Sequence, residues 1–231
     1  MYERELIDQR CLCVPASIGI GAGALMIANL RVLKEVVMTL TSTDKAASSS
    51  KSDRAVPAGT CPDSLVRAVR AEVRRGLDWQ QTADRIVGVL RGNLPDPAVL
   101  LPSSLRRGDP ACYQSHLLYA EQDGSFSVSA MVWLPGQQTV IHDHVAWCVT
   151  GVLQGREYEE IFALTNDGRA LNLTARNLNP AGTVSGFAPP GDIHRVRNTG
   201  DNVAISMHVY GADISRLGNS IRREYPLPIR P

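Results

Sequence analysis

Residues 140–155 read Val-Ile-His-Asp-His-Val-Ala-Trp-Cys-Val-Thr-Gly-Val-Leu-Gln-Gly, and this stretch decides how the rest of the chain is interpreted. His142 and His144 stand two apart in a run that predicts a β-strand. Because side chains alternate between the faces of a strand, both imidazoles point one way and Asp143 points the other. Two neutral imidazoles on one face can bind one metal ion at roughly 2 Å. A bare His-x-His is also compatible with a packed or exposed pair that binds nothing.

The composition bounds the class of protein. A length of 231 residues suits one domain with extensions. The net charge of +1 provides no basic field, so we expect no nucleic-acid partner. The five cysteines are odd in number and irregularly spaced, which indicates reduced thiols and a cytoplasmic protein rather than a disulfide framework.

The N-terminal part of the chain differs from the rest. Residues 11–30 carry no charge and suggest a membrane span or a signal sequence. However, three acids and two arginines precede them, and glycines within them weaken a helix, so no membrane association is expected. The polar, Ser-rich tract at residues 39–59 predicts a disordered linker. We therefore expect residues 1–59 to be an extension and linker, with residues 1–37 outside the fold and Met38 as the working start.

Residues 60–110 are expected to form a helical arm that serves as scaffold. Apolar residues recur at helical spacing in two segments, at Leu65, Val66, Val69 and Val73, and at Trp79, Ala83, Ile86, Val87 and Leu90. Asp78 followed by Gln81 matches the start of a capped helix, and Gly92 is a suitable stop.

From Tyr113 the apolar pattern alternates, as in strands. Asp123-Gly124, Pro135-Gly136 and Gln154-Gly155 predict turns between them. About eight short strands are expected, including residues 126–134, 148–153, 156–164, 171–178, 183–188, 194–197 and 203–210. Many short strands separated by Gly/Pro turns predict a mainly β fold, a cupin-type jelly-roll barrel over residues 111–225, within a domain that spans residues 60–231.

Two further groups of residues complete a candidate site. His194 heads a later strand, and barrel closure would bring it beside the first histidine pair, as a third ligand for a first-row metal. Ser206, His208 and Tyr210 alternate along the last predicted strand and share one face. If that face lines the barrel, these side chains form a polar chain toward the metal. The alternative is that Ile205, Met207 and Val209 point inward and the polar residues face water.

With these residues together, the sequence resembles the cysteine dioxygenase family of thiol dioxygenases, which are cupins with a three-histidine ferrous site. The resemblance covers residues 113–225 and rests on Ile-His-Asp-His at 141–144, Leu-Gln-Gly at 153–155, Gly-Asp-Ile-His-Arg-Val-Arg-Asn at 191–198 and Ser-Met-His-Val-Tyr at 206–210. It implies that His142, His144 and His194 bind Fe(II). It also implies that Ser206, His208 and Tyr210 form the outer-sphere triad, with Tyr210 beside the open coordination positions.

Two features depart from the family pattern. Cys148 lies near the cysteine that animal-type members join to the active-site tyrosine by a thioether, but the segment after His144 is one residue shorter. Cys148 is therefore interpreted either as that cysteine or as a small packed thiol. Cysteine-specific members hold the substrate carboxylate with an arginine in a Tyr-x-Arg segment, where this chain has Tyr113-Gln114-Ser115-His116.

A glutamine in this segment, with no arginine, resembles the 3-mercaptopropionate dioxygenases. Gln114, Ser115 and Arg195 are the candidate substrate contacts, with Arg197 as another source of charge, and His116 is expected to be structural. The sequence thus predicts an Fe(II)-dependent dioxygenase that uses O₂ to oxidise L-cysteine or 3-mercaptopropionate to its sulfinate. The alternatives are a non-enzymatic cupin that senses a metal or ligand, and an iron oxygenase acting on a non-thiol, which would normally have a carboxylate ligand. No oligomeric state is predicted.

Overall fold

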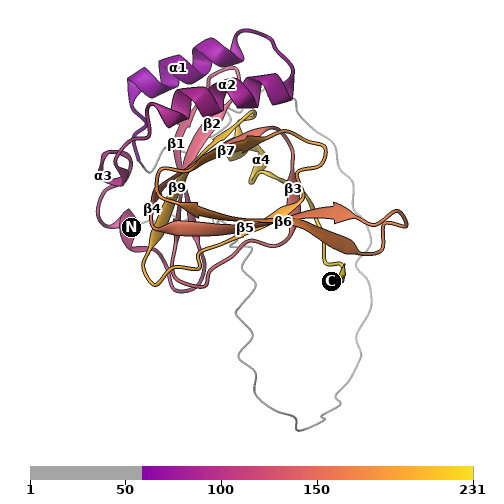
Figure 1. The fold of residues 1–231 in the computed structure, drawn as a ribbon. Helices are drawn as coiled ribbons and strands as arrows, with labels where there is room; N and C mark the ends of the chain where they lie inside the picture. Colours follow the sequence, from indigo (N-terminus) through magenta and orange to yellow (C-terminus); the bar gives the residue numbers. More distant parts are fainter. Residues whose placement is uncertain (1–58, 231) are drawn as a thin grey trace, which may run out of the picture. The chain divides into compact units, whose positions relative to one another are not determined.

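In the computed structural model of this chain, residues 59–230 are described. They form two β-sheets that face each other and a pair of helices that lies against one of the sheets (Figure 1). The predicted N-terminal extension, with residues 11–30 and Met38, lies outside the described residues.

The two predicted helices are present. They are α1 (Asp63–Val73) and α2 (Trp79–Arg91), and the short helices α3 (Pro97–Leu100), η1 (Leu105–Arg107) and α4 (Ile214–Leu217) were not predicted. The Asp78 carboxylate accepts a hydrogen bond of 2.8 Å from the N–H of Gln81, which confirms the predicted cap. Ile86 and Leu90 are fully buried, but Trp79 is 47% exposed, so its assignment to the buried face was wrong.

The first sheet has the strand order β1-β2-β9-β4-β7, and the second has the order β10-β3-β8-β5-β6-β11. From β2 to β5 and from β6 to β10, successive strands alternate between the sheets, as in a jelly roll, whereas β1 with β2 and β5 with β6 pair within one sheet. The strands are β1 (Gln114–Ala120), β2 (Ser127–Trp133), β3 (His142–His144), β4 (Cys148–Gln154), β5 (Arg156–Leu164), β6 (Leu171–Pro180), β7 (Val184–Phe187), β8 (His194–Arg197), β9 (Ala204–Tyr210), β10 (Ile221–Glu224) and β11 (Ile229–Arg230). All the ladders are antiparallel except that of β6 with β11. The mainly β, cupin-type fold is confirmed, and β10 and β11 were not predicted.

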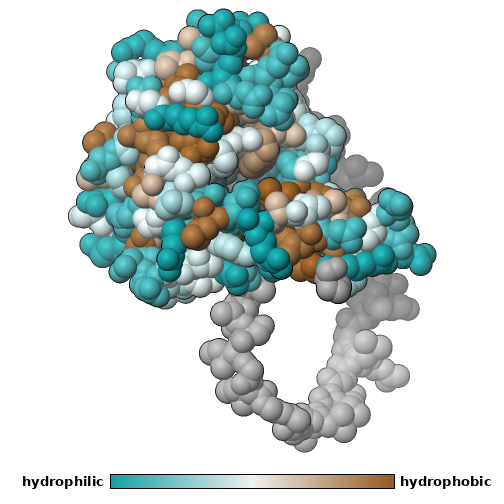
Figure 2. Space-filling view, in the orientation of Figure 1, coloured by the Kyte–Doolittle hydropathy of each residue, from teal (hydrophilic) through white to brown (hydrophobic). Residues whose placement is uncertain are grey.

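The first sheet is buried on both faces. Alternate residues of its central strands join one apolar cluster with the helices: Val128, Ala130, Val132, Ile205, Met207 and Val209 from the strands, and Leu65, Val69, Ile86 and Leu90 from α1 and α2. The outward surface over α1 and α2 is mostly hydrophilic, and hydrophobic side chains gather where the helices meet the sheets (Figure 2). Because the helices cover one face, the other alternate residues point between the two sheets. The apolar and the polar residues of β9 are therefore both buried, on opposite faces.

A glycine lets α2 approach the first sheet closely. Gly186 lies on β7, and a Cβ atom there would come within 2.8 Å of Val87 Cγ2 and 3.1 Å of Val149 Cγ2. Any side chain at this position would push the helix away from the sheet.

The described cysteines differ in state. Cys61 and Cys148 carry free thiols, whereas Cys112 is disulfide-bonded. The expectation of reduced thiols therefore fails at Cys112. Among residues 59–230, no helix is both long and apolar enough to cross a membrane.

Two substitutions in α2 should change stability in opposite directions. Ile86→Ala should lower the free energy of unfolding by about 2–5 kcal/mol, because it leaves a cavity under a fully buried side chain. Gly88→Ala should raise it by about 0.5–1 kcal/mol, because a Cβ there meets no atom and alanine favours the helix. Urea unfolding of the two variants measures both effects, and equal midpoints would contradict the packing described.

Candidate metal centre and the adjoining hydrogen-bonded chain

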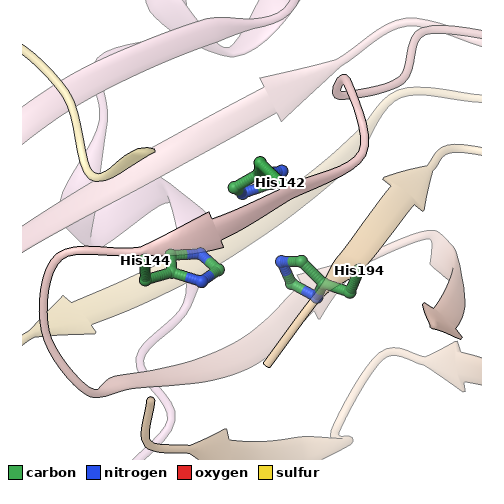
Figure 3. A group of neighbouring side chains, drawn as sticks. All are labelled: His142, His144 and His194. Atoms are coloured by element: carbon green, nitrogen blue, oxygen red, sulfur yellow. The ribbon is translucent and has the colours of Figure 1, made fainter. Parts of the chain in front are cut away.

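Three histidines meet between the two sheets. His142 and His144 lie on β3, and His194 begins β8, where it pairs directly with His142. All three are buried, and their candidate ligand atoms lie within 4.8 Å of one another. Their rings converge (Figure 3), with centroids 4.7 to 4.9 Å apart. Small ring rotations would allow one ion to contact all three.

Each imidazole has an acceptor at its Nδ1 atom. His142 Nδ1 lies 3.0 Å from the carbonyl oxygen of Val140, and His144 Nδ1 lies 3.0 Å from a carboxylate oxygen of Asp192. His194 Nδ1 lies 2.8 Å from a carboxylate oxygen of Glu159. Because all three partners accept hydrogen bonds, we assign the ring proton to Nδ1 in each case. The Nε2 lone pairs are then free to bind a metal.

The charge states of these groups fit a divalent cation. Burial, followed by the neighbouring imidazoles, lowers the pKa of His142 well below its ordinary value. Burial also lowers the pKa of His144 to about 4, although Asp192 opposes this shift. Burial alone would raise the pKa values of Glu159 and Asp192, but hydrogen bonds from His194 and His144 outweigh it and lower both. At neutral pH His142 and His144 are therefore neutral, and two ionised carboxylates stand behind the centre.

Asp143 points away from the other two side chains of β3, as strand alternation predicts. Its carboxylate accepts a hydrogen bond of 2.8 Å from the Tyr225 hydroxyl and another from Arg222 on β10. Since β10 also pairs with β3 in the same sheet, β10 holds the histidine strand both by its ladder and through Asp143.

Phe187 of β7 forms an apolar wall of the centre. Its ring centroid lies 4.6 Å from that of His144 and 5.1 Å from that of His194. Phe187 also packs against the cluster of Cys148, Tyr210 and Ile214. This side chain therefore connects the metal centre with the first sheet.

The polar residues of β9 form a hydrogen-bonded chain on the interior face of the first sheet. Ser206 Oγ lies 2.9 Å from His208 Nε2, and the Tyr210 hydroxyl lies 3.3 Å from His208 Nδ1. Thr150 Oγ1 is also 3.3 Å from His208 Nδ1, and the indole N–H of Trp133 donates to Ser206 Oγ at 3.2 Å.

Burial sets the ionisation of this chain. Burial, then the charges of His144 and His194, lowers the pKa of His208 to about 3. Burial also raises the pKa of Tyr210 well above its ordinary value. The chain at neutral pH therefore consists of a hydroxyl, a neutral imidazole and a protonated phenol.

Cys148 lies directly opposite Tyr210 in the β4–β9 ladder. Both are buried and share one apolar cluster with Ile214, and burial raises the pKa of the Cys148 thiol. The shorter segment after His144 therefore still brings Cys148 next to Tyr210.

The candidate substrate contacts on β1 and β8 lie on different faces of their strands. Directly opposed residues of an antiparallel pair share a face. Ser115 is opposite Met131, which packs against the Cys148–Tyr210 cluster, so Ser115 lies on the site side of β1. Gln114 and His116 are opposite Val132 and Ala130, which belong to the helix-side core.

Arg195 is not brought to the histidines. Its guanidinium forms an ion pair with Glu160, on the face of β8 opposite His194. Arg197 shares that face and lies over the ring of Tyr158, with 5.7 Å from its Cζ atom to the ring centroid.

The residues that hold the ligands in place were not predicted. Asp192 and Glu159 are the acceptors behind two of the histidines, and Thr150 and Trp133 bind the chain on β9. The sequence did contain one signal for Glu159. Glu157 and Glu159 are two residues apart in a predicted strand, so both carboxylates lie on one face, where apolar side chains would be expected if that face is buried.

Two kinds of substitution should separate ligands from their supports. His194→Ala should abolish stoichiometric metal binding, because it removes one of three ligand nitrogens. Glu159→Gln should weaken metal affinity by about 10- to 100-fold while leaving three ligands. Metal analysis after dialysis against chelators of graded affinity measures both, with His116→Ala as the control on the opposite face. Full metal retention by His194→Ala would contradict the assignment.

Part of the chain is similar to a known family and to several solved structures. The family described as "Cysteine dioxygenase type I" matches residues 108–219. Solved structures with similarity include the protein TT1209 from Thermus thermophilus (22% identity, 47% of this chain, 91% of that chain, TM-score 0.36). A Cupin 2 conserved barrel domain protein from Salinispora arenicola has 23% identity over 50% of this chain and 87% of that chain, with a TM-score of 0.36. An oxalate oxidase has 18% identity and a TM-score of 0.36 over 46% of this chain, which spans 53% of that protein's length.

Structural similarities of this size have no bearing on activity. The family match is different, since it begins just before β1, ends just after α4 and contains the three histidines and the whole β9 chain. This match supports assigning residues 108–219 to the cysteine dioxygenase family.

Proposed function

We propose that this protein is an Fe(II)-dependent thiol dioxygenase that oxidises a small thiol carboxylate to its sulfinate with both atoms of O₂. The observation that carries the proposal is the convergence of three buried imidazoles, each with its Nδ1 atom engaged, next to the Ser206–His208–Tyr210 chain. The family match supports the same reaction class.

The ligand set suits a metal that must also bind an anionic substrate. Three neutral imidazoles leave the full charge of a divalent ion uncompensated within the first coordination sphere, which favours a thiolate. When bound there, iron would hold thiol and O₂ side by side, so that their reaction becomes intramolecular. Asp192 and Glu159 keep two of the imidazoles in the required tautomer and orientation.

Tyr210 is the proposed proton donor and orienting group. Its hydroxyl lies against His208, and Phe187, which packs against the cluster of Cys148 and Tyr210, also contacts the ring of His144. A phenol held in an apolar environment interacts strongly with charge that develops on a reacting oxygen or sulfur atom. The thioether between Cys148 and Tyr210 that the family resemblance implies stays a prediction, supported by their direct pairing.

The polar environment of the proposed substrate favours a thiol without an amine. Ser115 is on the site side of β1 where cysteine-specific relatives have an arginine, and Arg195 is engaged with Glu160 on the far face. The carboxylate contact is then a neutral hydrogen bond, about half as strong as a charge-assisted one. 3-Mercaptopropionate needs only this contact, whereas L-cysteine also brings an ammonium that must be solvated or bound.

A non-enzymatic metal or ligand sensor is the rival function. Such a protein needs the three histidines but not a second buried polar chain. Burial of Ser206 and His208 carries a desolvation cost that their mutual hydrogen bonds only offset. A chain of this kind is better explained by a role in proton transfer or substrate orientation.

Tyr210→Phe should lose turnover by about 10²- to 10⁴-fold and keep its metal, because only the hydroxyl is removed. Oxygen uptake at saturating thiol, together with the metal content, measures the effect. Tyr158→Phe is the matched control, since its ring lies on the outer face beneath Arg197. An unchanged rate in Tyr210→Phe would exclude the phenol from the reaction.

A panel of thiols tests the activity itself. Iron-loaded protein should consume O₂ with 3-mercaptopropionate at least as efficiently as with L-cysteine, and the product should be the sulfinate. Oxygen electrode traces with product mass determination decide this. A kcat/KM more than tenfold higher for L-cysteine would overturn the substrate preference, and metal binding without thiol-dependent O₂ uptake would favour the sensor.

A further inference from the structure

A second inward-pointing carboxylate, Glu157, lies at the far end of the β9 chain. It precedes Glu159 by two residues on β5, so both point between the sheets, but it does not contact the metal ligands' Nδ1 atoms. Its side chain is only 2% exposed, and within the described part of the chain its Oε1 atom is buried without a hydrogen-bond partner. A buried carboxylate with spare acceptor capacity is costly unless it has a use.

Glu157 continues the chain that begins at Tyr210. Ser206 and Trp133 are the side-chain donors close enough to its carboxyl group to lower its pKa. Ser206 is also the partner of His208 Nε2, at 2.9 Å. The polar path therefore runs from the Tyr210 hydroxyl through His208 and Ser206 to Glu157, and its two ends lie on different sheets.

The single hydroxyl hydrogen of Ser206 determines the direction of the hydrogen bonds along this path. Ser206 has one hydroxyl hydrogen and two candidate acceptors, His208 Nε2 and the Glu157 carboxylate. Charge-assisted hydrogen bonds are about twice as strong as neutral ones, so the hydrogen goes to an ionised Glu157. His208 must then donate from Nε2 to Ser206, and its Nδ1 atom is left to accept from Tyr210.

The environment of Glu157 suits a group that gains and loses a proton near neutrality. Burial raises its pKa to about 7, donation by Ser206 and Trp133 opposes this, and the charge of Glu159 adds to it. Glu159 is the charged group that acts on it from its own strand. Trp133 of β2 and Ser206 of β9 face it from the first sheet, and Asn179 is its register partner on β6.

We propose that Glu157 is the terminal proton acceptor for the substrate thiol, reached through Tyr210, His208 and Ser206. In one relay the thiol S–H proton passes to the Tyr210 oxygen, and the phenol proton passes to His208 Nδ1. The Nε2 proton then passes to Ser206, and the Ser206 proton passes to Glu157. The thiol becomes a thiolate and the Glu157 carboxylate becomes a carboxylic acid. Tyr210 and Ser206 each regain a proton, and His208 stays neutral but ends with its proton on Nδ1 instead of Nε2. This inference rests on the proposed function, because it takes a thiol as the substrate.

Infrared difference spectroscopy tests the relay without turnover. Zinc-loaded protein, which cannot carry out redox chemistry, is mixed with 3-mercaptopropionate at neutral pH. The wild type should develop the carbonyl band of a protonated carboxylic acid, and Glu157→Gln should lack it. Glu160→Gln, on the outer face of the same strand, should keep it. Ser206→Ala serves as a second variant, since it interrupts the path with Glu157 in place and should also lose the band.

Kinetics of the iron-loaded enzyme provides an independent readout. Glu157→Gln should lower kcat/KM for 3-mercaptopropionate by about 10²-fold at pH 7, the usual size of a general-base contribution. The deficit should shrink as the pH rises toward the pKa of the free thiol, because more substrate then arrives already deprotonated. A purely structural defect would give a deficit independent of pH.

The outcomes separate this inference from the proposed function. A wild-type protein that binds the thiol and consumes O₂ but shows no carboxylic acid band overturns the role of Glu157 and leaves the dioxygenase intact. A band that persists in folded Glu157→Gln or Ser206→Ala overturns it as well. A protein that neither binds a thiol nor consumes O₂ with one overturns the proposed function, and the relay falls with it.

Discussion

The Nδ1 hydrogen bonds of the three histidines are the interactions on which the site depends. Each one places the ring proton on Nδ1 and leaves Nε2 with a lone pair, and without them an imidazole could present a proton to the metal instead. The acceptors come from three different places: the carbonyl of Val140, Asp192 just before β8, and Glu159 on β5. Because β3, β8 and β5 are neighbours in one sheet, the ladder that builds the fold also aligns ligands and acceptors.

Polar residues can line the face of the first sheet that points between the sheets, because its other face buries the apolar residues against the helices. The first sheet carries its apolar residues on the face toward α1 and α2, where Val69, Ile86 and Leu90 belong to the same buried cluster as residues of β2, β4 and β9. Each fully buried aliphatic side chain there contributes roughly 1.5–3 kcal/mol. The interior face then tolerates Ser206 and His208, whose hydrogen bonds offset most of their desolvation cost. The helical arm therefore stabilises a sheet whose inner surface is free to carry chemistry.

The interior is also organised by charge. Glu159 and Asp192 stand behind the ligands and are held ionised by hydrogen bonds from His194 and His144. Glu157, two residues from Glu159 on the same face, has no histidine partner, and its pKa moves the opposite way. Two carboxylates on one strand thus acquire different states from their surroundings alone, one backing a ligand and the other able to take up a proton.

Local pattern in the sequence determined which residues alternate, which helices form and which side chains share a face. His142 with His144, Ser206 with His208 and Tyr210, and the cap at Asp78 all follow from periods of two or 3.6 residues, and these are properties of the backbone alone. The tertiary structure decided what no period encodes. It paired β4 with β9 so that Cys148 meets Tyr210, placed Ser115 inward and Arg195 outward, and supplied Asp192 and Glu159 as acceptors. These outcomes depend on strand register and on which sheet each strand joins, and both are set by contacts between residues distant in the chain.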